Sequence, residues 1–298
     1  MKTLNLQLAA ILIIILSFIG CKKDDVAPNN KLKITEKSLL WEVSGNGMDK
    51  PFHLYGSIHL IEKDKLTFLP TLESILENSS GLVLETDISS LEIAEAAKER
   101  MFLPSTISPK SYYTDEQWDL MQDVCDRVNF SFSFFEQVKP LAVTSFVFPN
   151  LLSDNKEDFT SYEEELVALA AKYNVKTSGF EEADYVYTYF DSLPLASQYK
   201  ELYGMMDQYD KEPESIRSEF EELVDAYQKQ DIYKFYEDVQ EDAFTYDQLI
   251  VKRNYHWLTK INNTFAGKLV AVGAGHLAGE QGLLELLRLE GYSIKALN

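Results

Sequence analysis

Two stretches of sequence decide the fold, residues 52–59 (FHLYGSIH) and residues 268–276 (KLVAVGAGH). The first alternates apolar and polar residues and the second is a continuous apolar run, and both patterns predict β-strands. Each stretch ends in the motif Gly-x-x-His, at residues 56–59 and 273–276. Open α/β sheets place their ligand sites at the carboxyl ends of strands. We therefore expect both histidines at one functional edge of a sheet.

The sequence around the two motifs repeats one order of elements: strand, Gly-x-x-His, helix, strand. The predicted elements outside the motifs are a strand at 37–43, a helix at 70–78, a strand at 81–85, a helix at 281–290 and a strand at 292–294. The repetition predicts two related halves. The fold class is therefore α/β, with a mixed central sheet from two strand–Gly-x-x-His–helix halves.

The middle of the chain is predicted to be a helical insert of about residues 105–263. Capping boxes and first-turn prolines predict helices that begin near residues 114, 161, 194 and 213. A short strand is predicted at 175–180 and one long helix at 241–263. The insert separates the two halves in sequence.

Composition excludes some classes of partner. The chain has 298 residues, of which 45% are hydrophobic, enough for the core of one large domain over residues 35–298. The formal net charge is −20, and no Lys/Arg cluster stands out in the mature part. Nucleic acid is therefore not an expected partner.

The N-terminus predicts a lipoprotein signal peptide at residues 1–21. Lys2 precedes an apolar run, Leu8–Ile19, that is too short to span a bilayer comfortably. The small residue before Cys21 resembles a bacterial lipobox, which implies cleavage before Cys21 and acylation of its thiol. An uncleaved anchor and a plain secretory peptide are the alternatives. Residues 22–34 are predicted to be a polar tether.

These signals place the protein in the cell envelope, lipid-anchored to a bacterial membrane. Residues 22–25 (KKDD) resemble an acidic tag that sends lipoproteins to the cell surface, which favours the outer membrane or the surface. If Cys21 is acylated, Cys125 has no partner in the chain, and we expect a buried thiol. Neither a disulfide framework nor a cysteine-type zinc site is expected.

Three residues at predicted strand ends could carry the chemistry. Imidazole is the commonest metal ligand and a general base near neutral pH, so His59 and His276 are candidates. A glycine three residues earlier, Gly56 or Gly273, allows a tight turn or close approach to a ligand. Glu85 ends the strand at 81–85 and would complete a two-His, one-carboxylate set or act as a base. The alternatives are packing or capping for the histidines and a helix-dipole role for Glu85.

The segments LYGSIH (54–59), LVLE (82–85) and VAVGAGHLAG (270–279) together resemble the TraB/GumN family, which is related to the Tiki proteases. The resemblance covers about residues 36–298 and implies an α/β core of two related halves. It also implies a metal-dependent protease that uses His59, His276 and Glu85. The metal implied is manganese or cobalt, and zinc is also compatible with these ligands.

The resemblance extends to residues of the insert. Arg253-Asn254 matches a pair that the family carries before the last motif, and Arg253 could stabilise an oxyanion or bind a substrate carboxylate. A surface salt bridge is the alternative for Arg253. Glu163 and Glu181 occupy the places of two further acidic residues, with Glu163 where the family usually has Asp.

Two functions follow as expectations. The first is a metal-dependent hydrolase, peptidase-like, for a peptide or small-molecule substrate. The second is a non-catalytic surface lipoprotein that binds or sequesters a peptide signal. The chain has neither a Gly-x-Ser-x-Gly elbow nor a His-Glu-x-x-His helix, which argues against those hydrolase classes. The sequence makes no prediction of oligomeric state.

Overall fold

The computed structural model describes residues 34–153, 155–182 and 184–297. The predicted signal peptide with Cys21, and the tether apart from Ile34, lie outside the described residues. Within those ranges, every helix is too short or too polar to cross a membrane.

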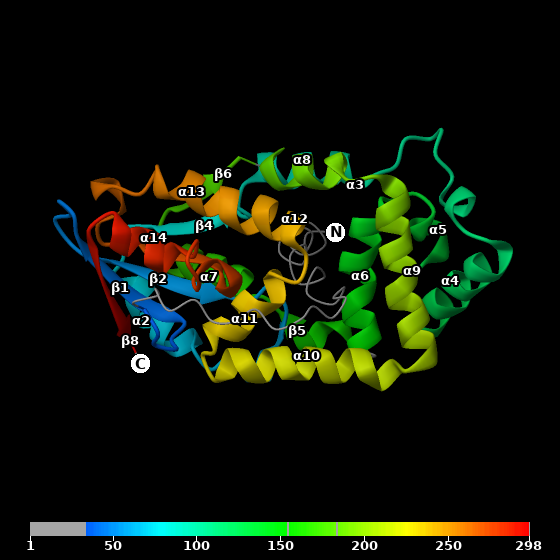
Figure 1. Cartoon of the computed structure of the whole chain (residues 1–298), viewed down its shortest axis with the longest axis horizontal. Helices are drawn as coiled ribbons and strands as arrows, with labels where there is room; N and C mark the ends of the chain where they lie inside the picture. The colour runs from blue at the N-terminus through cyan, green and yellow to red at the C-terminus, as the bar shows by residue number, and fades with distance from the viewer. Residues whose placement is uncertain (1–33, 154, 183, 298) are drawn as a thin grey trace.

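A six-stranded mixed sheet forms one end of the molecule (Figure 1). Its strands, in spatial order, are β6 (Thr177–Glu181), β4 (Leu82–Thr86), β7 (Leu269–Gly273), β2 (Phe52–Ser57), β1 (Leu40–Gly45) and β8 (Tyr292–Leu297). β1 is antiparallel to both of its neighbours, and the other five strands run in one direction. The predicted mixed sheet is therefore confirmed.

The two motif-bearing strands are direct neighbours in this sheet. β2 and β7 pair in parallel, with Ser57 opposite Gly273. Because the strands end at the same level, the two Gly-x-x-His motifs leave the sheet side by side. β4 flanks β7 on its other side and brings Glu85 to the same edge.

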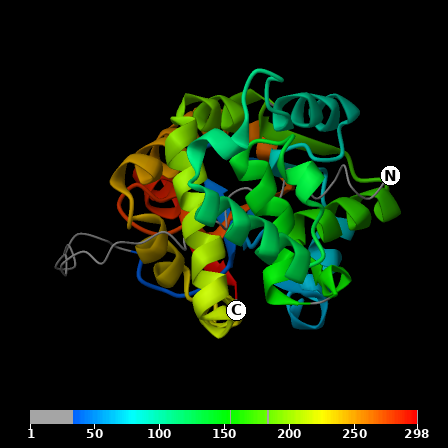
Figure 2. The same cartoon turned by 90° about the vertical axis from the view of Figure 1, so that its right-hand side faces the viewer.

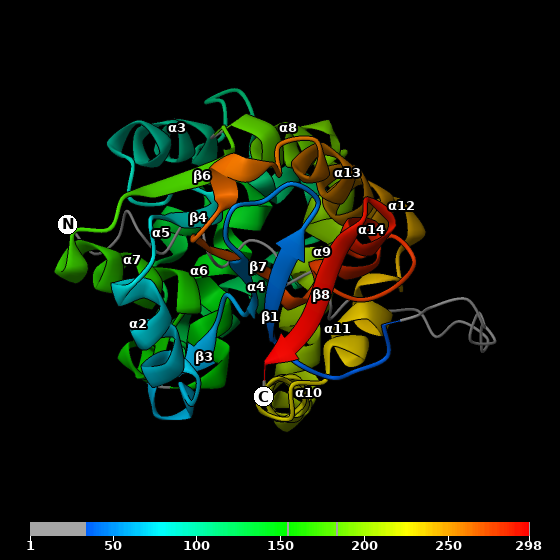
Figure 3. The same ribbon diagram turned by 90° about the vertical axis from the view of Figure 1, so that its left-hand side faces the viewer.

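The helices that follow the motifs lie on opposite faces of the sheet, as Figure 3 shows. They are α2 (Leu69–Glu77) and α14 (Leu283–Leu289). The β2–α2–β4 connection crosses β7, whereas the β7–α14–β8 connection crosses β2 and β1 in the other direction. Right-handed crossovers in opposite directions place their helices on opposite faces. The sheet thus lies between α2 and α14.

The mid-chain insert is mainly helical and packs against the strand ends (Figures 1 and 2). Its helices are α4 (Asp115–Arg127), α5 (Phe132–Phe135), α6 (Pro140–Leu152), α7 (Tyr162–Tyr173), α8 (Asp184–Ser192), α9 (Leu195–Lys211), α10 (Pro213–Gln228), α11 (Ile232–Val239), α12 (Ala243–Tyr246) and α13 (Lys252–Leu258). A further helix, α3 (Leu91–Met101), follows β4 and precedes the insert. The capping box at Thr114 is present, with both of its hydrogen bonds. α6 was not predicted, since it is apolar around most of its circumference and lacks helical periodicity.

The predicted long helix at 241–263 is wrong in its extent. The helical run begins at Ala243, passes through a π-helical turn at Asp247–Val251 and ends at Leu258. A π turn rotates the residues that follow it relative to a regular α-helix, and such turns are frequent at functional sites. This turn ends two residues before Arg253.

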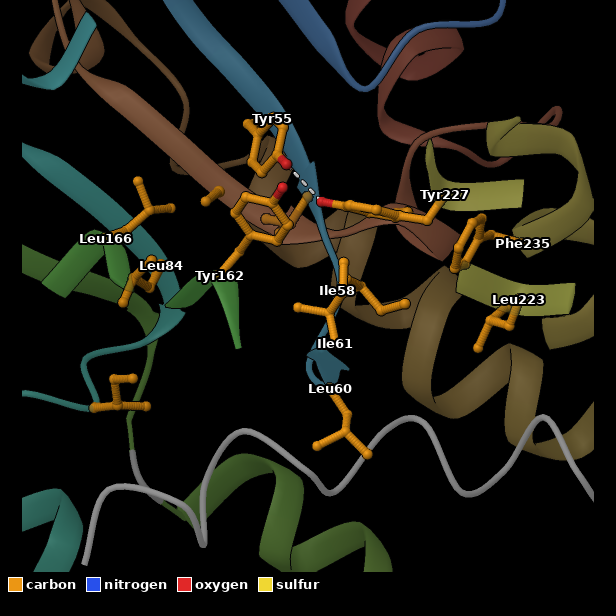
Figure 4. Close-up of a cluster of buried hydrophobic side chains, with 14 of the residues drawn as sticks. Tyr55, Ile58, Leu60, Ile61, Leu84, Tyr162, Leu166, Leu223, Tyr227 and Phe235 are labelled. Carbon is orange, nitrogen blue, oxygen red and sulfur yellow. Dashed lines mark hydrogen bonds between the residues drawn. The ribbon is translucent and has the colours of Figure 1, made fainter. Parts of the chain in front are cut away.

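A small second sheet joins the N-terminal half to the insert. It pairs β3 (Ile61–Glu62) with β5 (Phe159–Thr160). Beside it lies the apolar cluster of Figure 4, in which the Tyr55 and Tyr227 hydroxyls are 2.6 Å apart. Ile58 and Leu60 are buried in this cluster. The core therefore holds the backbone on both sides of His59.

Candidate functional site

Residues from both motifs and from β4 converge at one edge of the sheet. His59 follows β2 by two residues, His276 ends a short 3-10 turn (Ala274–His276) after β7, and Glu85 is the fourth residue of β4. All three are buried, with exposed fractions of 7%, 1% and 7% respectively. The tertiary structure thus brings together the three residues that the sequence singled out.

The three side chains meet beside Gly273. A Cβ atom placed on Gly273 would be 3.3 Å from Glu85 Oε1, 3.5 Å from His59 Nε2 and 3.7 Å from His276 Cδ2. We call this meeting point of the three side chains the Gly273 junction. Gly273 has φ −53°, so a tight turn is not the reason for glycine here. The reason is close approach, because a side chain would occupy the junction.

Glu85 is held as an ionised carboxylate. Its Oε1 accepts a hydrogen bond from the Gly273 backbone N–H at 2.7 Å, and its Oε2 accepts one from Arg253 Nη2 at 2.5 Å. Burial by itself would raise the pKa of Glu85, but Arg253, the two histidines and the Gly273 N–H together lower it to about 2. The carboxylate therefore carries its charge at neutral pH.

His276 is fixed in a single tautomer by Asn254. The Asn254 amide nitrogen donates to the carbonyls of His276 and Gln281, so its Oδ1 faces His276 Nδ1 at 2.7 Å. Nδ1 is consequently the protonated nitrogen, and Nε2 presents a lone pair 3.6 Å from Glu85 Oε1. Burial, aided by Arg253 and His59, lowers the pKa of His276 to about 3, which keeps the ring neutral.

Arg253 is completely buried, so the alternative of a surface salt bridge is wrong. Its guanidinium donates twice to Glu181 and once to Glu85, and its Nη1 contacts the Leu249 carbonyl and His276 Nε2 at 3.3 Å and 3.5 Å. These contacts engage all five N–H groups of the side chain. In this arrangement Arg253 has no donor left for an oxyanion.

Glu181, at the end of β6, is the anchor for Arg253. It accepts a further hydrogen bond from Trp257 Nε1 at 2.7 Å. The Trp257 ring also lies against the imidazole of His276, with centroids 4.4 Å apart, and under the Arg253 guanidinium at 4.7 Å. Sequence reasoning did not assign Trp257 to the site. Its position one helical turn after Arg253 was the available signal.

Glu163 stands next to His59 from the first turn of α7. Its Oε1 lies 2.9 Å from His59 Nδ1 and also accepts the Ser57 hydroxyl. The Nδ1 contact lacks regular hydrogen-bond geometry, and Glu163 Oε2 has no hydrogen-bond partner among the described residues. Burial would lower the pKa of His59, but Glu163 and Glu85 raise it overall. Ser57, inside the motif itself, was also missed by sequence reasoning.

The comparisons with known proteins agree with the motifs. No curated protein and no solved structure matches the chain. The sequence does match the TraB/PrgY/gumN family over residues 39–296, which include every residue of the site. The chain therefore belongs to the TraB/PrgY/gumN family.

Proposed function

We propose that the protein is a metal-dependent hydrolase of the cell envelope that acts on a peptide or a related amide or ester. The observation that carries the proposal is the Gly273 junction, where a carboxylate oxygen and two imidazoles face one point. Two histidines and one carboxylate are a common ligand set of catalytic metal sites.

The donor atoms at the junction suit a divalent cation. His276 Nε2 carries a lone pair, and His59 Nε2 is buried without a hydrogen-bond partner among the described residues. In the described ranges, no three His, Cys, Asp or Glu side chains lie close enough together to coordinate a metal ion as they stand. The side chains at the junction are therefore farther apart than coordination distance. Metal–ligand bonds are about 2 Å long, so the side chains would have to move closer together to hold an ion.

Charge also favours a cation. The buried cluster contains three carboxylates, on Glu85, Glu163 and Glu181, but one permanent cation, Arg253. Buried charges are costly unless they are neutralised. A divalent cation at the junction would balance this excess of negative charge.

The metal ion and the surrounding residues would have different chemical roles. When bound, a manganese, cobalt or zinc ion would polarise the scissile carbonyl and lower the pKa of water at the site. Glu85, ionised at neutral pH, and the two imidazoles would hold the ion. Asn254 keeps Nε2 of His276 unprotonated, with its neighbours Glu85 Oε1 at 3.6 Å and Arg253 Nη1 at 3.5 Å. Arg253 stabilises the charge of Glu85 from the other side.

We also propose that the protein is lipid-anchored in the cell envelope. The apolar run Leu8–Ile19 and the following Cys21 support a lipid anchor in a bacterial envelope membrane, at the outer membrane or the cell surface. Such an anchor would hold the domain at the membrane through the tether at residues 22–34.

A second candidate is a non-catalytic lipoprotein that binds or sequesters a peptide signal. The observation that favours it is closure of the site. A Cβ atom on Gly275, within the second motif, would be 3.0 Å from Val239 of α11, so α11 packs tightly over this loop. Substrate entry therefore requires α11 or its neighbours to move.

Metal content separates the two candidates. The protein without residues 1–21 is loaded with Mn²⁺, Co²⁺ or Zn²⁺, dialysed, and its metal measured by elemental analysis. We expect about one ion per chain in the wild type, loss of that ion in His276→Ala, and retention in His256→Ala. His256 is the matched control, since it is an exposed histidine on α13. A wild-type protein that retains none of the three metals would contradict the hydrolase proposal.

A further inference from the structure

Half of the buried side-chain polar atoms that lack a hydrogen bond in the described part of the chain belong to one pair of side chains. Among the described residues, His59 Nδ1, His59 Nε2 and Glu163 Oε2 are all buried and without a regular hydrogen bond. Buried polar groups in native proteins are almost always satisfied, so exceptions call for an explanation. An ion pair that only stabilised the fold would satisfy its own atoms. This pair leaves both ring nitrogens of His59 available.

The backbone is built to hold Glu163 opposite His59. On one side of His59, the Ile58 carbonyl accepts a hydrogen bond from Tyr162 N. On the other side, Ile61 of β3 pairs with Thr160 of β5. The first turn of α7 is therefore tied to the loop that carries His59 on both flanks.

The contacts of Glu163 also define its orientation. The Ser57 hydroxyl donates to Oε1, the same oxygen that lies 2.9 Å from His59 Nδ1. A hydroxyl from the motif thus holds the carboxylate against the imidazole. Histidines that bind metals usually donate their second N–H to such an acceptor, which sets the tautomer and the orientation of the ring.

We propose that Glu163 is the positioning residue of His59: it accepts the Nδ1 proton, thereby presents Nε2 as a lone pair to the Gly273 junction, and through its negative charge makes that lone pair a stronger ligand. This inference rests on the proposed metal site. A small rotation of the ring would give the Nδ1–H a regular hydrogen bond to Oε1, which already lies 2.9 Å from Nδ1. Asn254 performs the corresponding task for His276 through an amide.

The test uses two substitutions and one control. Glu163→Gln keeps an acceptor for the Nδ1 proton and for Ser57 but removes the charge. Glu163→Leu removes the acceptor. Glu165→Gln is the matched control, since Glu165 is a carboxylate on the same helical turn that accepts from Thr160 and has no contact with His59.

Two measurements are made on the full chain in detergent. The first is the tautomer of His59 in the metal-free protein, from nitrogen–proton correlation spectra of ¹⁵N-histidine-labelled chain at alkaline pH. The chain has only four histidines, so single substitutions assign the signals. The second is the affinity for Mn²⁺ by calorimetry.

We expect the Nδ1–H tautomer in the wild type, Glu163→Gln and Glu165→Gln, and its loss in Glu163→Leu. The affinity for Mn²⁺ should fall about 10- to 100-fold in both Glu163 variants and stay unchanged in the control. If Glu163→Leu does not fold, Glu163→Gln still decides the question through its Mn²⁺ affinity.

Two results would overturn the inference: a His59 tautomer that is the same in Glu163→Leu as in the wild type, or wild-type Mn²⁺ affinity in Glu163→Gln. One further result would separate this inference from the proposed function. If the wild type binds no Mn²⁺ but the tautomer follows residue 163, positioning by Glu163 holds and the metal site fails.

Discussion

The two Gly-x-x-His motifs share a sequence pattern, a strand end and a burial level, yet their histidines differ in environment. His276 is locked by an amide that can only accept its Nδ1 proton, and a guanidinium lies 3.5 Å from its Nε2. His59 faces the carboxylate of Glu163 and has no regular hydrogen bond in the described structure. The group that contacts Nδ1, rather than the motif, therefore determines the protonation of each imidazole and how firmly the ring is held.

This difference gives the site a rigid half and an adjustable half. Burial and Arg253 lower the pKa of His276 to about 3, whereas Glu163 raises the pKa of His59. One short motif used twice thus places two imidazoles with different properties at one point. The predictions below test this asymmetry, beginning with the largest expected effect.

Removal of Arg253 should break the rigid half. Arg253→Met leaves Glu85 and Glu181 buried without their cation, and we expect unfolding free energy to fall by about 3–5 kcal/mol. Urea unfolding measures the change. Arg127→Met is the control, because Arg127 pairs with Asp123 and Asp210 at the surface and its loss should change stability little. Equal effects of the two substitutions would show that the buried network does not stabilise the fold.

The two histidines should make stability depend on pH in separate windows. The folded pKa of His276 is about 3 against 6.5 unfolded, so the unfolded chain binds a proton first and stability falls as pH drops below 6.5. Because the folded pKa of His59 is raised, its contribution is present below 6.5 and is lost as pH rises through that folded pKa.

Urea unfolding across a pH series distinguishes the two windows. Between pH 6.5 and pH 5, His276→Asn should lose about 2 kcal/mol less stability than the wild type. His59→Asn should instead flatten the decline above pH 6.5. If both variants alter the same window, the two imidazoles do not differ as the structure indicates.

The motif glycines should separate stability from metal binding. A Cβ atom on Gly56 would be 2.6 Å from Leu277 Cδ1 and 3.2 Å from Ala274 Cα, so Gly56→Ala should destabilise the fold by about 1–2 kcal/mol through overpacking and leave Mn²⁺ affinity unchanged. Gly273→Ala should do the reverse, because its Cβ atom would enter the Gly273 junction. Calorimetry and urea unfolding of both variants measure the two effects. If both variants lost stability and Mn²⁺ affinity to the same extent, the two glycines would not have separate roles.

The sequence predicted most of the α/β framework because local patterns encode it. The strands at 52–57 and 269–273 follow from their apolar patterns, and α4 and α10 begin where the capping box and the first-turn proline indicate. Sequence patterns failed for α6, which is apolar around most of its circumference, and for the π turn at 247–251, which depends on tertiary packing. Hydrophobic periodicity reveals a helix only when one face is apolar and the opposite face is polar, and neither α6 nor the π turn shows that pattern.

For the site, the sequence by itself determined which residues stand at strand ends: His59, His276 and Glu85. Local apolar patterns mark where each strand ends, so spacing in the sequence could identify these residues. The parallel pairing that brings the three strand ends to one edge is tertiary. Only the tertiary structure decided the second partners, Glu163 for His59 and Asn254 for His276, and made Arg253 a buried cation. Those contacts join residues far apart in the chain and depend on orientation and burial, which no spacing in the sequence encodes.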